Sequence, residues 1–271
     1  MKSKLIKRHA KMLFDFERTL PLLKAIKKIV KKGDVVVDVG CGLGILTFAA
    51  CYSGAKRVYA IDVDTESLEF AKRHAKKFKL DKKIIWLADH SYNVDLIEKA
   101  DVLIQETVGA SAFDENFLPT LVDARNRFLK RGGKIIPEEV SLYGAPCGNK
   151  GKLLAPPKRL AHILTQSITK KELKINATWR LKEKAKIKGI LLWPHVVWTK
   201  GCITDCSPSS KPTHWGQTLL PLGTRYQAVP HGTRYHTVTT VKFSLKITPH
   251  PKNPLYNSQI EWQIASPYEG K

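Results

Sequence analysis

Three glycines at alternate positions follow a short β-branched run and precede a helical pattern. They are Gly40, Gly42 and Gly44 in the segment DVGCGLG, where the absence of a Cβ lets the backbone turn tightly and approach a ligand closely. Asp62 ends the next predicted strand, where a carboxylate can accept hydrogen bonds from both hydroxyls of a ribose. Ile45 stands where a dinucleotide fingerprint has its third glycine. The pattern therefore predicts a nucleoside site and argues against a nicotinamide or flavin dinucleotide.

Polar residues at helical spacing precede the first predicted strand. His9, Met12 and Asp15 are spaced so that they can share one helix face, with Arg18 adjacent. The guanidinium of Arg18 can bind a carboxylate through two hydrogen bonds. Asp38, just before the glycines, suits a ligand that carries an amine and no phosphate. The same spacing is typical of an amphipathic helix with Met12 in the core, and composition alone favours that alternative.

Two glutamates bracket a glycine after the fourth predicted strand. Glu106 and Glu115 lie on either side of Gly109, in a loop of the kind that binds ligands in open α/β sheets. Two converging carboxylates suit a guanidinium, which offers five donors in a planar fork; a solvated acidic loop is the alternative. Farther along, His214 can pair with a carboxylate and Trp215 can form the wall of a cation site.

The elements that position these residues are read from hydrophobic patterning. Strand and helix patterns alternate over 1–138, which predicts a Rossmann-like, doubly wound parallel sheet. The predicted strands are 35–37, 57–61, 84–87, 102–104 and 134–136, and the predicted helices are 9–32, 45–51, 65–78 and 117–129. Within these helices, Pro21 is expected to break or kink the first, and Thr65 is a candidate cap of the third.

After Pro137 the pattern changes to short β-rich runs punctuated by proline and glycine. This predicts an antiparallel β-barrel domain over 139–271, behind a cofactor domain over 1–138. The expected strands are 140–143, 187–198, 217–222, 237–247 and 258–264. Residues 148–175 are poorly patterned and are expected to form a loop or a short helical excursion.

The motifs resemble those of two nested families. The stretch VVVDVGCGLGILTFAACYSGAKRVYAIDVD resembles the cofactor-binding segment of class I S-adenosylmethionine-dependent methyltransferases. The pattern H-x-x-M-L-x-D-x-x-R over 9–18, the two-glutamate (double-E) loop and the Thr-His-Trp (THW) loop over 213–215 resemble those of the protein arginine methyltransferases. The resemblance covers most of 9–222. It implies transfer of methyl groups from S-adenosyl-L-methionine to arginine guanidinium nitrogens of a protein substrate.

The resemblance also implies roles for particular residues. Glu106 and Glu115 would clamp the substrate guanidinium, with His214 paired to Asp15, and Trp215 would contact the substrate. Residues 89–91 take the place of the acid that meets the adenine. The implied cofactor contacts are His9, Met12, Arg18, Asp38, Gly40, Gly42, Gly44, Asp62, His90 and Ser91. An arm inserted in the barrel builds a dimer in this family, and we expect it to be reduced or missing in 148–175, which leaves a homodimer open.

Charge is distributed unevenly along the chain of 271 residues, whose net charge is +22. Residues 1–140 carry 26 basic and 19 acidic side chains, a balance of +7, whereas 141–271 carry 20 and 5, a balance of +15. A basic half attracts polyanions. We therefore expect an arginine-containing protein substrate that is itself RNA-binding or ribosomal, with RNA contact through the C-terminal half. The alternative is a solvated lysine-rich surface.

Other function classes fit the sequence less well. A nucleic-acid methyltransferase on the same fold fits the charge, but its Pro-Pro-aromatic signature is missing after the fourth strand. A non-catalytic cofactor-binding module fits less well, because the glutamates and the histidine are intact. Cys202 and Cys206, with His195 or His214, match no common zinc spacing, so we expect no metal. No apolar run is long enough for a membrane span, and the five cysteines predict no disulfide framework. We expect a cytoplasmic location, or a nuclear one in a eukaryote.

Overall fold

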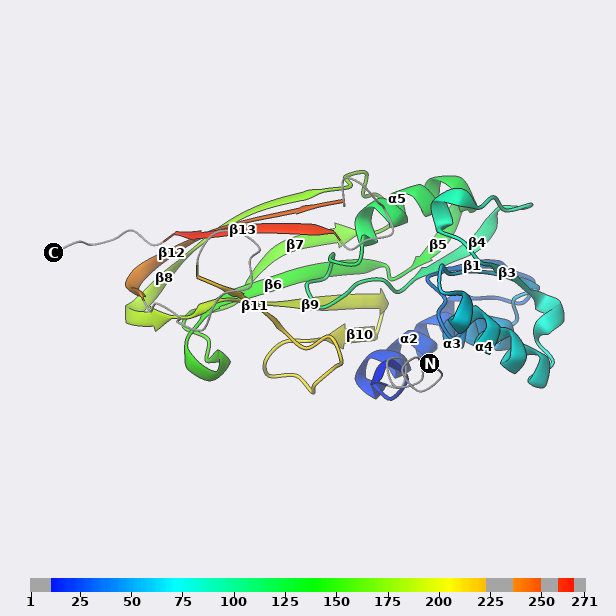
Figure 1. Ribbon diagram of the computed structural model, residues 1–271, viewed down its shortest axis with the longest axis horizontal. Helices are drawn as coiled ribbons and strands as arrows, with labels where there is room; N and C mark the ends of the chain where they lie inside the picture. The colour runs from blue at the N-terminus through cyan, green and yellow to red at the C-terminus, as the bar shows by residue number, and fades with distance from the viewer. Residues whose placement is uncertain (1–10, 223–235, 250–257, 266–271) are drawn as a thin grey trace.

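A computed structural model describes residues 11–222, 236–249 and 258–265 of the chain (Figure 1). Its first half is built on a five-stranded parallel sheet in the order β3-β2-β1-β4-β5. The strands are β1 (Val35–Val39), β2 (Arg57–Ile61), β3 (Ile84–Leu87), β4 (Ala100–Gln105) and β5 (Leu129–Ile136). The helices are α2 (Phe16–Ile29), α3 (Ile45–Tyr52), α4 (Thr65–Lys77) and α5 (Phe117–Phe128). Figure 1 shows α3 and α4 on one side of the sheet and α5 on the other, so the predicted doubly wound arrangement is confirmed.

Strand β1 is the centre of this sheet. All five of its residues are buried, as expected for a parallel strand covered on both faces. It pairs with β2 on one side and with β4 on the other, so the strand order reverses at β1. In open α/β sheets, ligands bind at the carboxyl ends of the strands beside such a reversal. The fold therefore provides a binding position at the end of β1.

The first helix differs from the sequence expectation. Helix α2 runs through Pro21 without interruption, and the chain breaks instead at Asp15, whose Oδ1 accepts a hydrogen bond from the Arg18 N–H as the N-cap. Proline lacks the N–H that would bond to the carbonyl four residues earlier, which belongs to Glu17. That carbonyl accepts a hydrogen bond from Thr204 Oγ1 at 3.3 Å. A partner from outside the helix thus replaces the bond that Pro21 cannot make.

The other expected elements of this half match the structure closely, with one corrected cap. Asp64, and not Thr65, caps α4, because the Asp64 carboxylate accepts hydrogen bonds from the N–H groups of Glu66 and Ser67. Thr65 is instead the first helical residue. Aspartate and threonine are both good caps, and here they are adjacent in the sequence. The path of the backbone after β2 therefore decides which of them caps the helix.

The second half is antiparallel, as expected. One sheet has the order β10-β9-β6-β7, with β11 paired to β9, and the other has the order β13-β12-β8. The strands are β6 (Glu139–Cys147), β7 (Lys158–Leu164), β8 (Leu173–Ile187), β9 (Gly189–Thr199), β10 (Cys202–Asp205), β11 (Thr218–Pro221), β12 (His236–Thr248) and β13 (Gln259–Ala265). The change from parallel to antiparallel pairing falls between Ile136 and Glu139.

Two expectations for this half need correction. The predicted strand 187–198 is divided at Lys188, because β8 and β9 belong to different sheets. The poorly patterned stretch 148–175 contains a single 3-10 turn at Asn149–Gly151 and then strand β7. Within the described residues of that stretch there is no α-helical arm. Alternating apolar residues in β7 were too few to identify the strand from the sequence.

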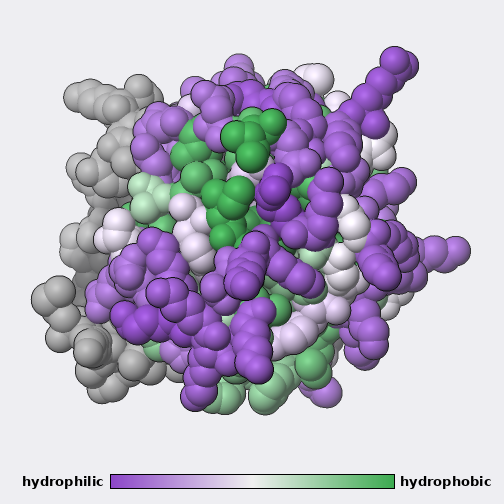
Figure 2. Space-filling model, turned by 90° about the vertical axis from the view of Figure 1, so that its right-hand side faces the viewer, coloured by the Kyte–Doolittle hydropathy of each residue, from purple (hydrophilic) through white to green (hydrophobic). Residues whose placement is uncertain are grey.

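Several contacts hold the two halves together. The Arg125 guanidinium donates to the carbonyls of Thr165 and Ile168 at 2.8 and 2.6 Å, and Lys28 donates to the carbonyl of Lys200. Figure 2 views the end formed by the parallel sheet, which is mostly hydrophilic around a small hydrophobic patch. Over the part of the chain that the structure describes, no helix is both long enough and apolar enough to span a membrane.

Candidate active site at the carboxyl edge of the parallel sheet

The register of three neighbouring strands sets the position of the site. Val39 of β1 lies opposite Ile61 of β2 and Gln105 of β4. The next residue along each strand is therefore Gly40, Asp62 and Glu106, respectively. Because the strands are parallel, all three residues emerge at the same edge of the sheet. The glycine loop, the ribose-type acid and the first glutamate, which the sequence identified separately, thus belong to one site.

The glycine loop is built for close approach. Gly40, Gly42 and Gly44 all have positive φ, at 76°, 52° and 80°, a conformation that other residues rarely adopt. A Cβ added at Gly40 would lie 3.0 Å from the methyl group of Thr107, so this loop packs directly against the double-E loop. The backbone of the first loop and the side chains of the second therefore face the same volume.

Asp62 is held rigidly at the end of β2. Its Oδ2 accepts the Gly42 N–H at 2.7 Å, and its Oδ1 accepts the Asp64 N–H at 2.8 Å. A carboxylate oxygen has two lone pairs, so each oxygen keeps capacity for one further donor. The side chain is only partly buried. Its geometry is therefore compatible with the predicted binding of two hydroxyls.

Asp38 lies beneath the glycine loop and is fully buried. Its Oδ2 accepts a hydrogen bond of 2.6 Å from Thr47 Oγ1, and its Oδ1 has no partner among the described residues. Burial raises the pKa of Asp38 to about 7, and the negative charges of Asp62 and Glu106 add to the rise, while the Thr47 bond opposes it. A buried oxygen without a partner costs free energy, so this atom marks a place for a donor from a ligand.

The turn after β3 places the two residues predicted near an adenine. Ser91 is buried, and its Oγ has no partner among the described residues. His90 Nδ1 accepts the Tyr92 N–H, and burial lowers the pKa of His90, which favours a neutral ring. Asp89 is exposed, and its carboxylate accepts hydrogen bonds from the His90 N–H and the Asn93 amide. The turn lies at the carboxyl end of β3, next to β2, as the prediction requires.

The double-E loop reverses direction at Gly109. Gly109 has φ 73°, and a Cβ there would come within 2.1 Å of the Asp114 carboxylate. The Asp114 carboxylate also accepts the Ser111 N–H, which fastens the far side of the turn to the near side. Only glycine permits this approach at position 109. The loop therefore doubles back, as its spacing predicted, and returns Glu115 toward the end of β4.

A buried amide fixes the base of the same loop. The Gln105 Nε2 donates to Thr107 Oγ1 and to the carbonyl of Phe117, both at 3.0 Å, so it joins the end of β4 to the start of α5. Gln105 is fully buried. Sequence reasoning missed this role. The available indication was a polar residue at the last position of an otherwise apolar strand.

Glu106 contacts a residue from α2. Its Oε2 lies 2.7 Å from the Arg18 guanidinium, and both side chains are largely buried. The same guanidinium donates to the carbonyl of Met12 at 2.8 Å, and Thr19 Oγ1 donates to that carbonyl as well. Arg18 Nε has no partner among the described residues. Arg18 therefore holds Glu106 in place, and its predicted contact with the cofactor carboxylate stays a prediction.

Glu115, the second glutamate, is exposed as a whole residue, although its carboxyl group is surrounded by protein atoms. Burial of its carboxyl group is the main cause that raises its pKa to about 7, and the negative charges of Glu106 and Asp114 raise it further, while Arg18 lowers it. The charges of the two glutamates therefore act on each other across the loop. Two nearby carboxylates repel each other, and a cation bound between them removes this repulsion.

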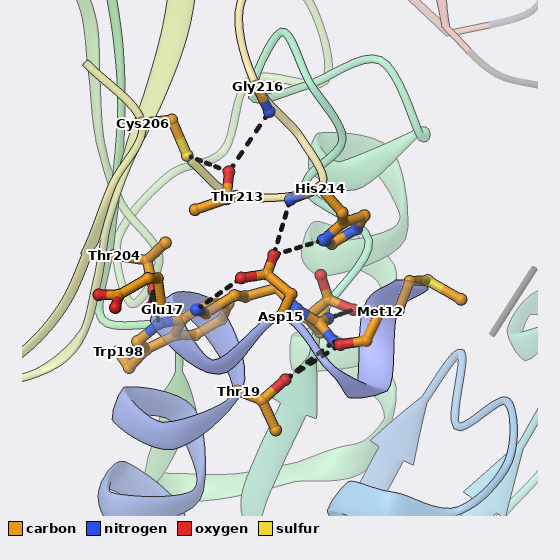
Figure 3. A network of polar contacts seen from close by, with 12 residues as sticks. Met12, Asp15, Glu17, Thr19, Trp198, Thr204, Cys206, Thr213, His214 and Gly216 are labelled. Atoms are coloured by element: carbon orange, nitrogen blue, oxygen red, sulfur yellow. Dashed lines mark hydrogen bonds and ion pairs between the residues drawn. The ribbon is translucent and has the colours of Figure 1, made fainter. Parts of the chain in front are cut away.

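A histidine from the second half completes the site (Figure 3). His214 Nδ1 lies 2.7 Å from Asp15 Oδ2, and the His214 N–H donates to the same oxygen at 2.9 Å. Asp15 thus caps α2 with one oxygen and holds the THW loop with the other. The predicted pairing of His214 with Asp15 is present, although their chemical roles stay predictions.

Three further residues, Trp215, Met12 and His9, were predicted to contact the substrate or the cofactor. Trp215 is buried beside Trp198, and the Arg18 guanidinium lies 6.0 Å from its ring, so the protein's own cation occupies one of its faces. Met12 contributes its carbonyl to the site, and Figure 3 shows its side chain directed away from Asp15. His9 lies outside the described residues.

All five cysteines are free and buried, and the described residues form no group of three or more suited to a metal.

Comparison with known proteins agrees with this geometry. Residues 16–137 match the family model described as ribosomal protein L11 methyltransferase (PrmA). Among solved structures, the Trypanosoma brucei PRMT1 enzyme-prozyme complex with AdoHcy superposes with a TM-score of 0.81 at 20% identity, covering 97% of this chain and 94% of that one. A crystal structure of PRMT6-SAH gives 0.76 at 21% identity, with coverage of 96% and 100%. These similarities establish the fold of both halves.

Curated relatives are closer in sequence. "Probable protein arginine N-methyltransferase 6" of Arabidopsis thaliana is 33% identical over 208 residues, which are 72% of this chain and 46% of that protein. The chain thus spans about half or less of the length of the first curated relatives that it matches. "Protein arginine N-methyltransferase 1" of Dictyostelium discoideum is 30% identical over 256 residues, which are 78% of this chain and 75% of that protein. The chain belongs to the protein arginine N-methyltransferase family.

Proposed function

We propose that this protein transfers methyl groups from S-adenosylmethionine to guanidinium nitrogens of arginine in a protein substrate. The observation that carries the proposal is the double-E loop, which doubles back at Gly109 beside the glycine loop and in which the negative charge of Glu106 raises the pKa of Glu115. Family membership supports it, as do the AdoHcy and SAH complexes of the structural neighbours. The chemistry of the pair is specific, because two nearby carboxylates match a planar cation with several donors.

The residues present fit the cofactor. Gly40 and Gly42 leave the backbone bare, Asp62 retains acceptor capacity for two hydroxyls, and buried Asp38 Oδ1 and Ser91 Oγ have no partners among the described residues. When bound, S-adenosylmethionine supplies a methyl group activated by its sulfonium charge. We propose that Gly40, Gly42, Gly44 and Asp38 surround its methionine part, that Asp62, His90 and Ser91 hold its nucleoside, and that His9, Met12 and Arg18 cover it.

The chain's own contribution is orientation and electrostatics. Glu106 is held by Arg18 at 2.7 Å, so one carboxylate of the pair stands in a fixed position. Glu115 has no hydrogen-bond or ion-pair partner among the described residues, so its carboxylate can accept two N–H donors from the substrate. Together they draw the positive charge of the guanidinium toward themselves and leave one terminal nitrogen directed at the glycine loop. Arginine does not lose its proton at neutral pH by itself, because its pKa is above about 12.

A proton must leave the guanidinium after methyl transfer, and two groups of the site are chemically able to accept it. Glu115, whose pKa is raised to about 7, is a better base than an ordinary carboxylate. His214 is held through Nδ1 by Asp15, which leaves Nε2 as the second ring nitrogen for a proton. We propose that Glu115 Oε receives the proton and that His214 Nε2 passes it toward solvent.

Labelled S-adenosylmethionine and an arginine-rich peptide test the proposal directly. The readout is radioactivity in methylated arginines after hydrolysis of the peptide. Glu106→Gln keeps the size of the side chain and removes its charge, so turnover should fall by about 100-fold or more while cofactor binding survives. Glu69→Gln, an exposed change on α4, is the matched control and should leave turnover unchanged. Full activity in Glu106→Gln would overturn the proposal.

The finer identity of the substrate is a further part of the proposal. The +15 balance of residues 141–271 supports a substrate protein that is itself RNA-binding or ribosomal. Incubation of the protein with ribosomal proteins and with a lysate fraction freed of RNA-binding proteins tests this. Equal labelling of both fractions would contradict it. We also propose a cytoplasmic location and a homodimer, which fractionation and light scattering would check.

A further inference from the structure

Strand β8 carries its charge in a regular pattern. Every second residue from 174 to 186 is polar or basic, and the residues between them include the buried Ile175, Trp179, Leu181 and Ile187. Successive side chains of a strand point to opposite faces. One face of β8 therefore packs on the core, and the other presents exposed Lys174, Arg180, Lys182 and Lys186 along about 40 Å of strand.

The neighbouring strand β12 extends this surface. Lys242 lies opposite Thr178, and Lys246 lies opposite Lys174, so both lysines belong to the same outer face. We call this surface the β8–β12 basic face, and its members are Lys174, Arg180, Lys182, Lys186, Lys242 and Lys246. It lies on the three-stranded sheet at the β-rich end of the molecule (Figure 1).

Among the side chains that the structure describes, the acidic neighbours of this face lie at one end of it. Glu172 pairs with Lys174 at 3.6 Å, and Glu261 lies opposite Lys246 in the strand register. Arg180, Lys182, Lys186 and Lys242 form no ion pair with any residue that the structure describes. These four cations are thus exposed, and no anion among the described side chains compensates them. An uncompensated field of one sign attracts a partner that bears a repeated charge of the other sign.

A hollow of about 250 Å³ lies in the middle of the face. It is lined by residues of all three strands, namely Asn176, Ala177, Thr178, Lys242, Phe243, Ser244 and Gln263. The amides and hydroxyls among them donate and accept hydrogen bonds, and the lysine adds a positive charge. A phosphate would therefore find both hydrogen-bond donors and a cation here.

The face begins near the proposed active site and runs away from it. Ser258, at the start of β13, donates to the carbonyl of Asp114 and to the Asn116 side chain in the segment that carries Glu115. Gln259 pairs with Thr248, at the same end of the sheet as Lys174. A polyanion bound along the face would therefore lead toward the double-E loop.

We propose that the β8–β12 basic face binds the phosphate backbone of a single-stranded nucleic acid. From 180 to 186 every second residue is basic, and such residues are spaced by about 6.6 Å along a strand, which matches a regular row of phosphates better than the irregular charges of an acidic protein. Trp179 and Phe243 are buried on the opposite face of the sheet. Stacking of bases is therefore not part of this contact, and binding depends on salt and tolerates any sequence.

The test compares two variants of the full chain with equal loss of charge. Arg180→Gln, Lys182→Gln, Lys186→Gln and Lys242→Gln together remove four charges from the face. Lys76→Gln, Lys77→Gln, Lys82→Gln and Lys83→Gln remove four exposed charges beside α4 and serve as the control. Binding of a labelled 20-nucleotide RNA and of a DNA of the same sequence is measured by fluorescence anisotropy at several salt concentrations. Thermal unfolding checks that both variants fold.

We expect the face variant to bind RNA at least about tenfold more weakly than the wild type. The slope of log affinity against log salt concentration should become less steep by roughly two to three, because each lost phosphate contact lowers the magnitude of the slope by about 0.7. The control should keep the wild-type slope. Equal weakening by both variants, or competition by poly-glutamate as strong as by RNA, would overturn the proposal. DNA binding equal to RNA binding would assign the site to the phosphate backbone alone. The assay needs no methyl transfer, so the proposed activity and this surface stand or fall separately.

Discussion

Arg18 of α2 and Glu106 at the end of β4 form a largely buried ion pair with an N–O distance of 2.7 Å. The pair joins the helix that precedes the sheet to the loop that carries both glutamates. Removal of one partner leaves the other charged and poorly solvated. Because Glu106 also faces the proposed substrate position, this contact links the stability of the fold to the arrangement of the site.

A double-mutant cycle measures this link. Arg18→Met and Glu106→Gln should each lower the free energy of unfolding, and the double variant should lose less than the sum of the two. We expect a coupling of about 1–3 kcal/mol, typical of residues in direct contact. Urea unfolding of the four proteins supplies the values. Strict additivity would mean that the pair contributes nothing to folding.

The pH dependence of substrate use should report on Glu115. Its pKa is raised to about 7, so at pH 6 most of the free protein carries a neutral Glu115, and at pH 8 most carries the anion. The anion binds a guanidinium, and the neutral acid does not. We therefore expect kcat/KM for an arginine peptide to rise with pH up to about 7 and then to level off. Glu115→Gln should be slow at every pH and lack this rise; an unchanged profile would assign the titration to another group.

Asp38 should make the fold less stable at high pH. Its pKa in the folded state is about 7, whereas an unfolded aspartate titrates near about 3.9, so the folded state binds the extra proton between these values. Stability therefore falls as pH rises from about 4 to 7. Asp38→Asn keeps an acceptor for Thr47 and has no charge to bury, so it should exceed the wild type in stability at pH 8 by up to about 4 kcal/mol.

Urea midpoints of both proteins at pH 5 and pH 8 give the comparison for Asp38. The difference between them should shrink toward pH 4, because Asp38 is then neutral in both states. A constant difference across this range would show that burial does not perturb the Asp38 carboxyl group.

The sequence predicted the parts of the site that depend on strand ends. Gly40, Asp62 and Glu106 follow three recognisable strands, and parallel pairing brings them to one edge once the strand order is known. The contacts that fix these residues were not predictable, because they join positions far apart in the chain. Thr204 replaces the bond lost at Pro21, although 187 positions separate it from Glu17. Local patterns contain no information about such partners.

The same limit explains the errors in the second half. The β pattern predicted over 187–198 gave no sign that the chain passes from one sheet to another at Lys188, since it included only Ile187 of β8 and the strands on both sides of Lys188 are extended. Gln105 is a comparable case inside the site. A polar residue at a strand end usually indicates a solvated position. Only the structure shows that the Gln105 amide bonds to Thr107 in the loop and to Phe117 at the start of α5.

Gln105 is expected to act as a positioning residue. Its two hydrogen bonds require an N–H donor at the atom facing the Phe117 carbonyl, so Gln105→Glu places an acceptor against an acceptor, while Gln105→Ala only removes the bonds. We expect losses of stability of about 1–3 kcal/mol for the alanine variant and more for the glutamate. Thermal unfolding measures the loss of stability. Steady-state kinetics with the peptide should show that kcat and KM change by different factors. A kcat that follows the wild type at temperatures where both variants are folded would leave Gln105 a purely structural role.

Asp15 performs two tasks with its two oxygens, and a short series of substitutions can separate them. Oδ1 caps α2 through the Arg18 N–H, and Oδ2 binds the ring and the backbone N–H of His214. Serine retains the cap but is too short to reach His214, whereas alanine loses both contacts. Asp15→Ser should therefore be more stable than Asp15→Ala by about 1 kcal/mol. Both variants should lose methyl transfer to the same extent, because in each of them His214 is no longer held in place. If the serine variant kept wild-type turnover, the contact with His214 would have no part in the reaction, and Asp15 would matter only as the first residue of the helix.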